Sequence, residues 1–358
     1  MPLRTRPKAI HRQLAIGLTL TLALGLAFAQ RSVFALPEER AAVAVEALSR
    51  DLARAAERKD WEAAVAVASQ LTAARPDSAP DAYNLACMLS RAGRREDAIV
   101  ALTRSAELGF AFTSTLLRDE DLDPIREQRG YAAALERIRQ NNAAELELAR
   151  PRLANAPLLS FAPKRTPKGT SNEPLPLIVA LHGYGGTPEP IAEAFRASAS
   201  RLGALLVVPR GQEGAGNGFG WGVVEQAEYL VLETIERTAQ ERPVGPVVLT
   251  GFSQGAGVAL TMAARYPERF AGVVAVAGWF EERLAPVPER LPSPFPRFAF
   301  LNGERDEAAA NNRLAARRLE KAGAGVRVRI YPGLGHEFPP AEGRDRELEQ
   351  ALRFAFGL

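Results

Sequence analysis

Residues 247–265 read VVLTGFSQGAGVALTMAAR and decide the fold of the second half of the chain. An apolar run at 247–250 leads into a G-x-S-x-G motif, and an apolar stretch with helical spacing follows. This order predicts a buried strand, a sharp turn that exposes Ser253, and a helix that begins beside the serine. The free N–H groups at the start of such a helix stabilise a developing negative charge. A buried serine in a glycine-rich turn is the alternative, because the motif by itself is short.

The rest of the chain from residue 157 onward alternates between strand-like and helix-like patterns. Strands that are apolar on both faces and separated by helices predict an α/β fold with a mostly parallel sheet flanked by helices. A short edge strand is expected at 158–162 and a turn at 166–170. The other expected strands are 175–181, 205–208, 247–250, 270–276, 298–301 and 326–331, and the expected helices lie near 190–202, 223–241, 255–265, 308–322 and 343–355.

A serine nucleophile needs a base, and the chain has three histidines. His11 lies in the N-terminal basic region, His182 follows the first long strand, and His336 follows the last strand. In this class of fold the base comes after the serine and the acid in the chain. We therefore predict His336 as the base and expect His182 to shape the neighbouring turn.

The predicted acid is Asp306, which ends the segment LNGERD after the penultimate strand. A carboxylate at this place orients the imidazole and stabilises its protonated form. Glu304 and Glu307 are nearby rivals, and a solvated loop carboxylate is the structural alternative.

The motifs LHGYGG at 181–186, GFSQG at 251–255, Asp306 and His336 together resemble an α/β-hydrolase, over residues 157–358. They are similar to the phospholipase and carboxylesterase group and to the secreted feruloyl-esterase and depolymerase-like group. The resemblance implies a serine carboxylesterase that cleaves an ester or thioester through an acyl-enzyme, with the triad Ser253, Asp306 and His336.

The resemblance also implies an oxyanion hole built from the backbone N–H groups of Tyr184 and Gln254. The expected substrate is a small-molecule or polymer ester, and we predict no metal and no organic cofactor. Two other functions stay open. The chain could be a non-catalytic interaction protein with the hydrolase fold as a scaffold, or a serine peptidase on the same fold.

Two tryptophans are candidates for the substrate pocket. Trp221 lies in the segment 211–222, which has six glycines and is expected to be mobile, and Trp279 lies in the segment 278–296, which has five prolines. Both segments follow strand ends, where ligands bind in α/β folds. An open, partly aromatic pocket for short acyl groups is expected, and ordinary packing of both tryptophans is the alternative.

Residues 38–150 are rich in Ala, Leu, Arg and Glu and have helical spacing. The segment WEAAV at 61–65 recurs 34 residues later as REDAI at 95–99. Paired helices with this period resemble the tetratricopeptide repeat, which predicts a small all-α domain before the hydrolase. Such a domain could bind a protein partner in a groove, or it could be a spacer that covers the second domain.

Residues 1–29 combine a basic start, an uncharged run and the sequence AFA before Gln30, which predicts a cleaved signal peptide. The expected location is therefore periplasmic or secreted, and the alternative is an uncleaved membrane anchor. The formal charge is +3, from 45 Lys+Arg against 42 Asp+Glu. Four of the basic residues precede Ala29, so the mature chain has no basic excess and no nucleic-acid partner is predicted. A single cysteine, Cys87, excludes an intrachain disulfide.

Overall fold

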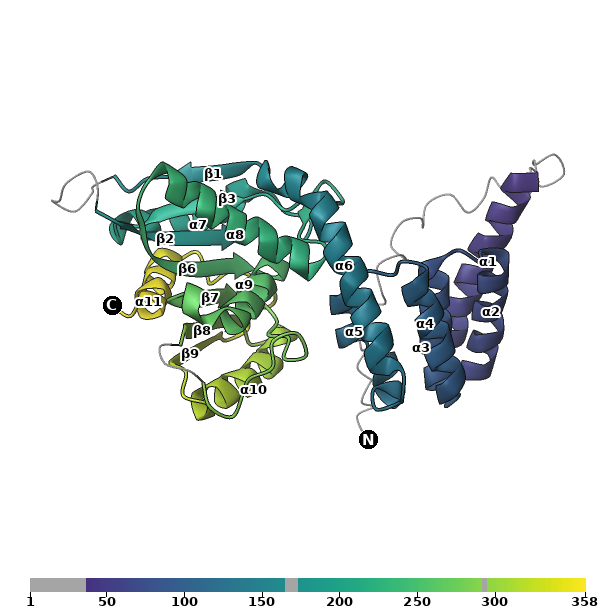
Figure 1. Cartoon of the computed structure of the whole chain (residues 1–358). Coiled ribbons are helices and arrows are strands. Elements are labelled where there is room, and N and C mark those ends of the chain that lie inside the picture. Colours follow the sequence, from purple (N-terminus) through teal and green to yellow (C-terminus); the bar gives the residue numbers. More distant parts are fainter. Residues whose placement is uncertain (1–36, 165–172, 292–294) are drawn as a thin grey trace, which may run out of the picture. The chain divides into compact units, whose positions relative to one another are not determined.

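The computed structural model describes residues 37–164, 173–291 and 295–358 (Figure 1). The chain divides into two compact units between Asn141 and Asn142, here called the helical unit and the sheet unit. Each unit has hydrophobic clusters of its own. The predicted signal peptide or anchor at 1–29 and the predicted turn at 166–170 lie outside the described residues.

The sheet unit contains a seven-stranded sheet in the order β1-β3-β2-β6-β7-β8-β9. Every neighbouring pair is parallel except β1 with β3, so the predicted edge strand is the antiparallel one. The chain leaves β2 toward β3 and later returns to β6 on the other side of β2, which makes the β2–β6 boundary a topological switch point. The strands are β1 (Leu158–Phe161), β2 (Leu175–Leu181), β3 (Leu205–Pro209), β6 (Val244–Phe252), β7 (Gly272–Val276), β8 (Arg297–Gly303) and β9 (Val326–Tyr331).

Helices cover both faces of this sheet, as the apolar strands require. In β2, Leu177 and Val179 join one core cluster, whereas Ile178 and Ala180 join the cluster on the opposite face. The first face is covered by α8 (Val224–Glu241), α9 (Gln254–Arg265) and α10 (Ala308–Lys321), and the second by α7 (Pro188–Arg201) and α11 (Arg344–Phe356).

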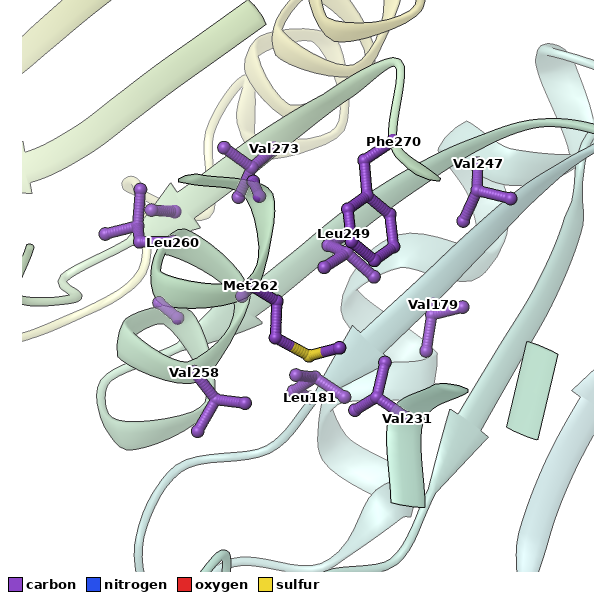
Figure 2. Close-up of a cluster of buried hydrophobic side chains, with 14 of the residues drawn as sticks. Val179, Leu181, Val231, Val247, Leu249, Val258, Leu260, Met262, Phe270 and Val273 are labelled. Atoms are coloured by element: carbon purple, nitrogen blue, oxygen red, sulfur yellow. The ribbon is translucent and has the colours of Figure 1, made fainter. Parts of the chain in front are cut away.

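The core beneath α9 fixes the position of that helix. Figure 2 shows Met262 of α9 among Leu181 of β2, Leu249 of β6 and Val231 of α8, and all four side chains are buried. Burial of a side chain of this size stabilises the fold by about 1.5–3 kcal/mol. The first turn of α9, which follows Ser253, is therefore held at the carboxyl ends of β2 and β6.

Two features of the sheet unit differ from the sequence-based expectation. The segment predicted as a mobile loop forms a hairpin of β4 (Glu213–Ala215) and β5 (Gly218–Gly220), in which Gly214 pairs with Phe219. Because the segment is rich in glycine, it lacks the alternation of apolar and polar residues that predicts a strand. Helix α6 (Tyr131–Ala154) also continues past the predicted domain end at 150, because Leu153 is buried in the core of the sheet unit.

Over residues 37–141, which the structure describes, the helical unit is all α apart from one 3₁₀ turn. Helices α2 and α4 begin at the two copies of the repeated segment, while membership of the tetratricopeptide family stays a prediction. Leu102, Ile125 and Ile138 are fully buried in its core. No helix within the described ranges is long and apolar enough to cross a membrane. The elements are α1 (Pro37–Glu57), α2 (Trp61–Ala74), α3 (Ala79–Arg91), α4 (Arg95–Glu107), α5 (Thr113–Arg118), the 3₁₀ helix η1 (Glu120–Ile125) and the start of α6.

Candidate active site

Ser253 occupies a strained turn between β6 and α9, with φ 52° and ψ −119°. This left-handed conformation is rare for a residue with a side chain and is maintained by the packing around it. A Cβ on Gly251 would lie 2.6 Å from the Ala256 nitrogen, and one on Gly255 would collide with the backbone oxygens of Leu181 and His182. Both glycines of the motif are therefore required for strand, turn and helix to meet this closely.

Three loops at the same edge of the sheet bring the predicted triad together. The Nε2 atom of His336 lies 2.8 Å from the Ser253 Oγ, and its Nδ1 atom lies 3.3 Å from Asp306 Oδ1. The serine follows β6, the aspartate follows β8 and the histidine follows β9, all at the carboxyl end of the parallel sheet. The rival Glu304 instead accepts a hydrogen bond from the Gly333 N–H, at 2.9 Å, and so holds the loop that carries the histidine.

The acid and the base lie in different surroundings. The side chain of Asp306 is 2% exposed and that of His336 is 51% exposed. Burial raises the pKa of Asp306, but hydrogen bonds from His336 and from the Ala308 N–H outweigh it and hold that pKa below its ordinary value. The hydrogen bond to Asp306 raises the pKa of His336, against a smaller opposing effect of burial. The pair therefore favours an ionised carboxylate beside a basic imidazole.

The two residues expected to supply oxyanion donors flank the serine in different ways. Gln254 is the first residue of α9, where N–H groups have no partner inside the helix. Its side-chain Oε1 accepts a hydrogen bond from the Trp221 N–H at 3.2 Å. Tyr184 follows Gly183, and a Cβ on that glycine would lie 3.5 Å from the Ser253 Cβ. The turn that contains Tyr184 thus lies beside the nucleophile.

His182 has its two ring nitrogens engaged with backbone groups. The Gly211 N–H donates to Nε2 at 3.0 Å, so the proton is on Nδ1, which lies 2.8 Å from the Gly183 oxygen. The residue is 2% exposed, and burial lowers its pKa. A neutral imidazole with both nitrogens occupied cannot serve as the base. It instead ties the turn at 183–184 to the loop that begins the hairpin.

The two candidate tryptophans have different environments. Trp221 is 4% exposed, and its Nε1–H donates to the His182 oxygen at 2.7 Å. With Arg152 and Gln226 it lines a cavity of about 180 Å³ between α6, α8 and the hairpin. These contacts agree with the packing alternative for Trp221. Trp279 is 47% exposed, and its carbonyl oxygen would lie 3.4 Å from a Cβ on Gly257 in the first turn of α9.

Two buried asparagines near the acid escaped the sequence analysis. Asn302 donates a hydrogen bond to the Asp306 Oδ2 at 3.4 Å, and Asn312 donates to the Asn302 Oδ1 at 3.1 Å. Asn302 stands inside the LNGERD segment and could have been noticed there. Asn312 lies in α10 and has no motif around it. No group of three histidine, cysteine or acidic side chains suited to a metal ion is found among the residues that the structure describes.

Comparison with known proteins decides the family. A family model described as "Putative esterase" matches residues 163–351, which is more than half of the chain and includes the serine, aspartate and histidine above. The chain belongs to this esterase family. The sheet unit of the esterase accordingly has the α/β architecture that the resemblance implied, and the protein is a hydrolase that acts on esters.

Among solved structures, the esterase is similar to an uncharacterized protein from Bacillus cereus ATCC 10987, with 18% identity, 86% of this chain and 97% of that chain covered, and a TM-score of 0.46. A carboxylesterase from Mesorhizobium loti matches with 20% identity, 55% and 98% coverage and a TM-score of 0.44. The Bacillus cereus carboxylesterase matches with 18% identity, 58% and 99% coverage and a TM-score of 0.42. No curated protein matches the esterase significantly.

Proposed function

We propose that the esterase is a serine carboxylesterase in which Ser253 is the nucleophile, His336 the general base and Asp306 the acid that orients the imidazole. The observation that carries the proposal is the unbroken chain of contacts from Ser253 Oγ through the imidazole to a buried carboxylate. A hydrogen-bonded nucleophile and base, with a third group that orients the base, is the arrangement that acyl transfer requires.

The proposed reaction has two halves. His336 Nε2 takes the proton of the Ser253 hydroxyl as the oxygen attacks the ester carbonyl, and Asp306 stabilises the imidazolium. The N–H groups of Tyr184 and Gln254 stabilise the oxyanion of the tetrahedral intermediate. His336 then protonates the leaving alcohol or thiol, which leaves an acyl-enzyme. A water molecule, deprotonated by the same imidazole, attacks the acyl carbon. The imidazolium then returns the proton to the Ser253 Oγ as the acyl–oxygen bond breaks and the acid is released.

The proposed substrate is a small or exposed ester with a short acyl group. His336 is half exposed, and the side chains of Tyr184 and Trp279 are exposed on the segments that flank the nucleophile. Such a site accepts an ester that projects from a larger molecule, but it offers little enclosure for a long acyl chain. Rates on p-nitrophenyl esters of increasing chain length test this, and a clear preference for long chains would contradict it. A matched anilide, hydrolysed as fast as the ester, would favour a peptidase.

We further propose that the esterase is exported and that its signal is removed after Ala29. The support is the sequence pattern of residues 1–29. N-terminal sequencing of the protein from a periplasmic or culture fraction would begin at Gln30. A chain that keeps Met1 and sediments with membranes would instead show an uncleaved anchor.

The proposed nucleophile is tested by Ser253→Ala. We expect kcat on an aryl ester to fall by about 10⁴–10⁶-fold, since the remaining groups stabilise the transition state only weakly without it. Ser198→Ala is the matched control, because Ser198 is also buried but forms its hydrogen bonds with the Asp345 carbonyl oxygen and with Arg201. Equal rates for wild type and Ser253→Ala would favour the non-catalytic alternative.

A further inference from the structure

Asn302 and Asn312 are 1% and 0% exposed, although each has a polar amide. A buried amide without partners costs free energy, so the partners of these two side chains define their role. Asn302 lies in β8, near the acid, and Asn312 lies in the first half of α10. All of the hydrogen bonds described below are among buried groups.

The first set of bonds holds the backbone around Trp279. The Asn312 Nδ2 donates to the Gly278 oxygen at 2.6 Å, and the Asn312 Oδ1 accepts from the Phe280 N–H at 3.1 Å. The same amide thus binds the carbonyl before Trp279 and the N–H after it, as a neighbouring strand would. This contact fixes the backbone from which the exposed Trp279 side chain projects.

The second set of bonds leads to the catalytic acid. Asn312 also donates to the Asn302 Oδ1 at 3.1 Å, and Asn302 donates to the Asp306 Oδ2 at 3.4 Å. The other carboxylate oxygen of Asp306 receives the Ala308 N–H at 3.0 Å and faces the His336 Nδ1. With Oδ2 engaged by Asn302, the carboxylate cannot rotate freely and Oδ1 stays directed at the imidazole.

Residues 277–280, the segment around Trp279, also pack against the first turn of α9, beside the nucleophile. A Cβ on Gly278 would collide with the Ala256 side chain in the first turn of α9, and the Ala277 N–H donates to the Leu301 oxygen at 2.9 Å. Ala277 has a φ of 51°, which is unusual for a residue with a side chain. A segment with this little freedom transmits a displacement of its anchor to the edge of the site.

We propose that Asn312 is a positioning residue that sets two parts of the site together, the orientation of Asp306 through Asn302 and the placement of Trp279 at the substrate-binding rim. The inference rests on the proposed function. A purely structural role for the same side chain predicts something different, namely a loss of stability with unchanged kinetics of the folded enzyme.

The connections of Asn312 form two arms: one leads through Asn302 to Asp306, and the other holds the backbone on either side of Trp279. The kinetic constants of Asn312→Ala and Asn302→Ala on an aryl ester separate the two arms. Misplacement of a catalytic group by about 1 Å costs up to about 100-fold in rate, so we expect kcat to fall by about 10–100-fold in both variants. KM should rise several-fold, by about 3–10-fold, only in Asn312→Ala, because only that change frees Trp279. The double variant should lose no more kcat than either single variant, since both act through one connection.

Leu319→Ala is the matched control. Leu319 lies on the same helix, α10, and is fully buried, but its aliphatic side chain takes no part in this network. We expect this variant to have a lower melting temperature with the kcat and KM of the wild type. Asn312→Ala with both constants at the wild-type values would overturn the proposal.

If Asn312→Ala does not fold, the single variants Asn312→Ser and Asn302→Ala are compared instead. Unchanged kcat in the folded Asn302→Ala variant overturns the arm to Asp306. Hydrogen exchange at the Phe280 amide reads the other arm without catalysis. Exchange should accelerate in the Asn312 variant and not in Leu319→Ala, and equal protection in both overturns that arm. A failure of the proposed function is distinguishable from these outcomes, because it would appear as full activity in Ser253→Ala.

Discussion

The imidazole of His336 is half exposed, whereas the carboxylate that faces it is almost fully buried. Water therefore reaches the base, and the acid is shielded from it. The buried charge is supported by hydrogen bonds from the Ala308 N–H and from Asn302. Asp306 raises the pKa of the imidazole through its hydrogen bond first and through its charge second, and little solvent screens that charge.

This pair predicts the pH dependence of the esterase. The base acts only as neutral imidazole, so kcat/KM rises with pH through the pKa of His336 and is lost as pH falls below it. The hydrogen bond to Asp306 raises that pKa, which places the midpoint of the acidic limb above the ordinary imidazole value of about 6.5. Initial rates at substrate concentrations well below KM, from pH 5 to 9, measure the midpoint.

Asp306→Asn is the control for that assignment. The change removes the carboxylate whose hydrogen bond and charge raise the pKa of His336, so the midpoint should move to lower pH while kcat falls by about 10⁴-fold. A midpoint that is the same in both enzymes would show that the limb reports another group. Glu304→Gln should leave the midpoint in place, because Glu304 contacts the Gly333 N–H and not the ring.

The turn between β6 and α9 depends on the absence of side chains at particular positions. A Cβ on Gly255 would collide with backbone oxygens of β2 and of the residue after it, whereas one on Gly257 would make only an ordinary contact, 3.4 Å from the Trp279 oxygen. Both glycines lie in the first turn of the same helix, so they form a matched pair.

We expect Gly255→Ala to lower kcat/KM by about 100-fold or more, because α9 must move away from β2 and take the Gln254 N–H with it. Gly257→Ala should keep wild-type kinetics and gain about 0.4–1 kcal/mol in the free energy of unfolding. Kinetics and urea denaturation of both variants check this. Equal activity in the two would contradict the close packing of this turn.

The apolar pattern predicts the elements of the sheet unit but not all of their contacts. The strands β2 and β9 have the predicted bounds. Strand β2 is buried on both faces and shows as a continuous apolar run, whereas β9 is largely exposed and shows as alternating apolar and basic residues. The hairpin β4–β5 was missed, since its pairing rests on backbone hydrogen bonds between glycine-rich segments. Asn312 was missed for a related reason, since its role depends on which distant backbone groups the fold places beside it.

At the scale of the whole chain, the two compact units have separate cores. The triad residues all belong to the sheet unit, and the fully buried Leu102 belongs to the core of the helical unit. The chain boundary between the units lies within α6, which no composition change marks because the helix continues through it. The domain end was predicted at residue 150 because a proline, Pro151, comes next and is expected to end a helix. In the structure, α6 contains this proline near its C-terminal end.

Separate cores predict that the helical unit can be weakened without loss of catalysis. Leu102→Ala should destabilise that unit by about 2–5 kcal/mol. We expect the kcat/KM of the full chain at 25 °C to stay at the wild-type value while calorimetry shows a transition at lower temperature. A parallel fall of kcat/KM, at a temperature where both units are folded, would show that the helical unit contributes to the site.

The central claim is that Ser253 forms the acyl-enzyme, and covalent labelling tests it most directly. A fluorophosphonate probe reacts with a serine only when a base and oxyanion donors activate it. Mass mapping of the labelled full-length esterase should find the probe on Ser253, and ester hydrolysis should stop in proportion to labelling. Labelling of a different serine, or full hydrolysis by a fully labelled Ser253, would contradict the account.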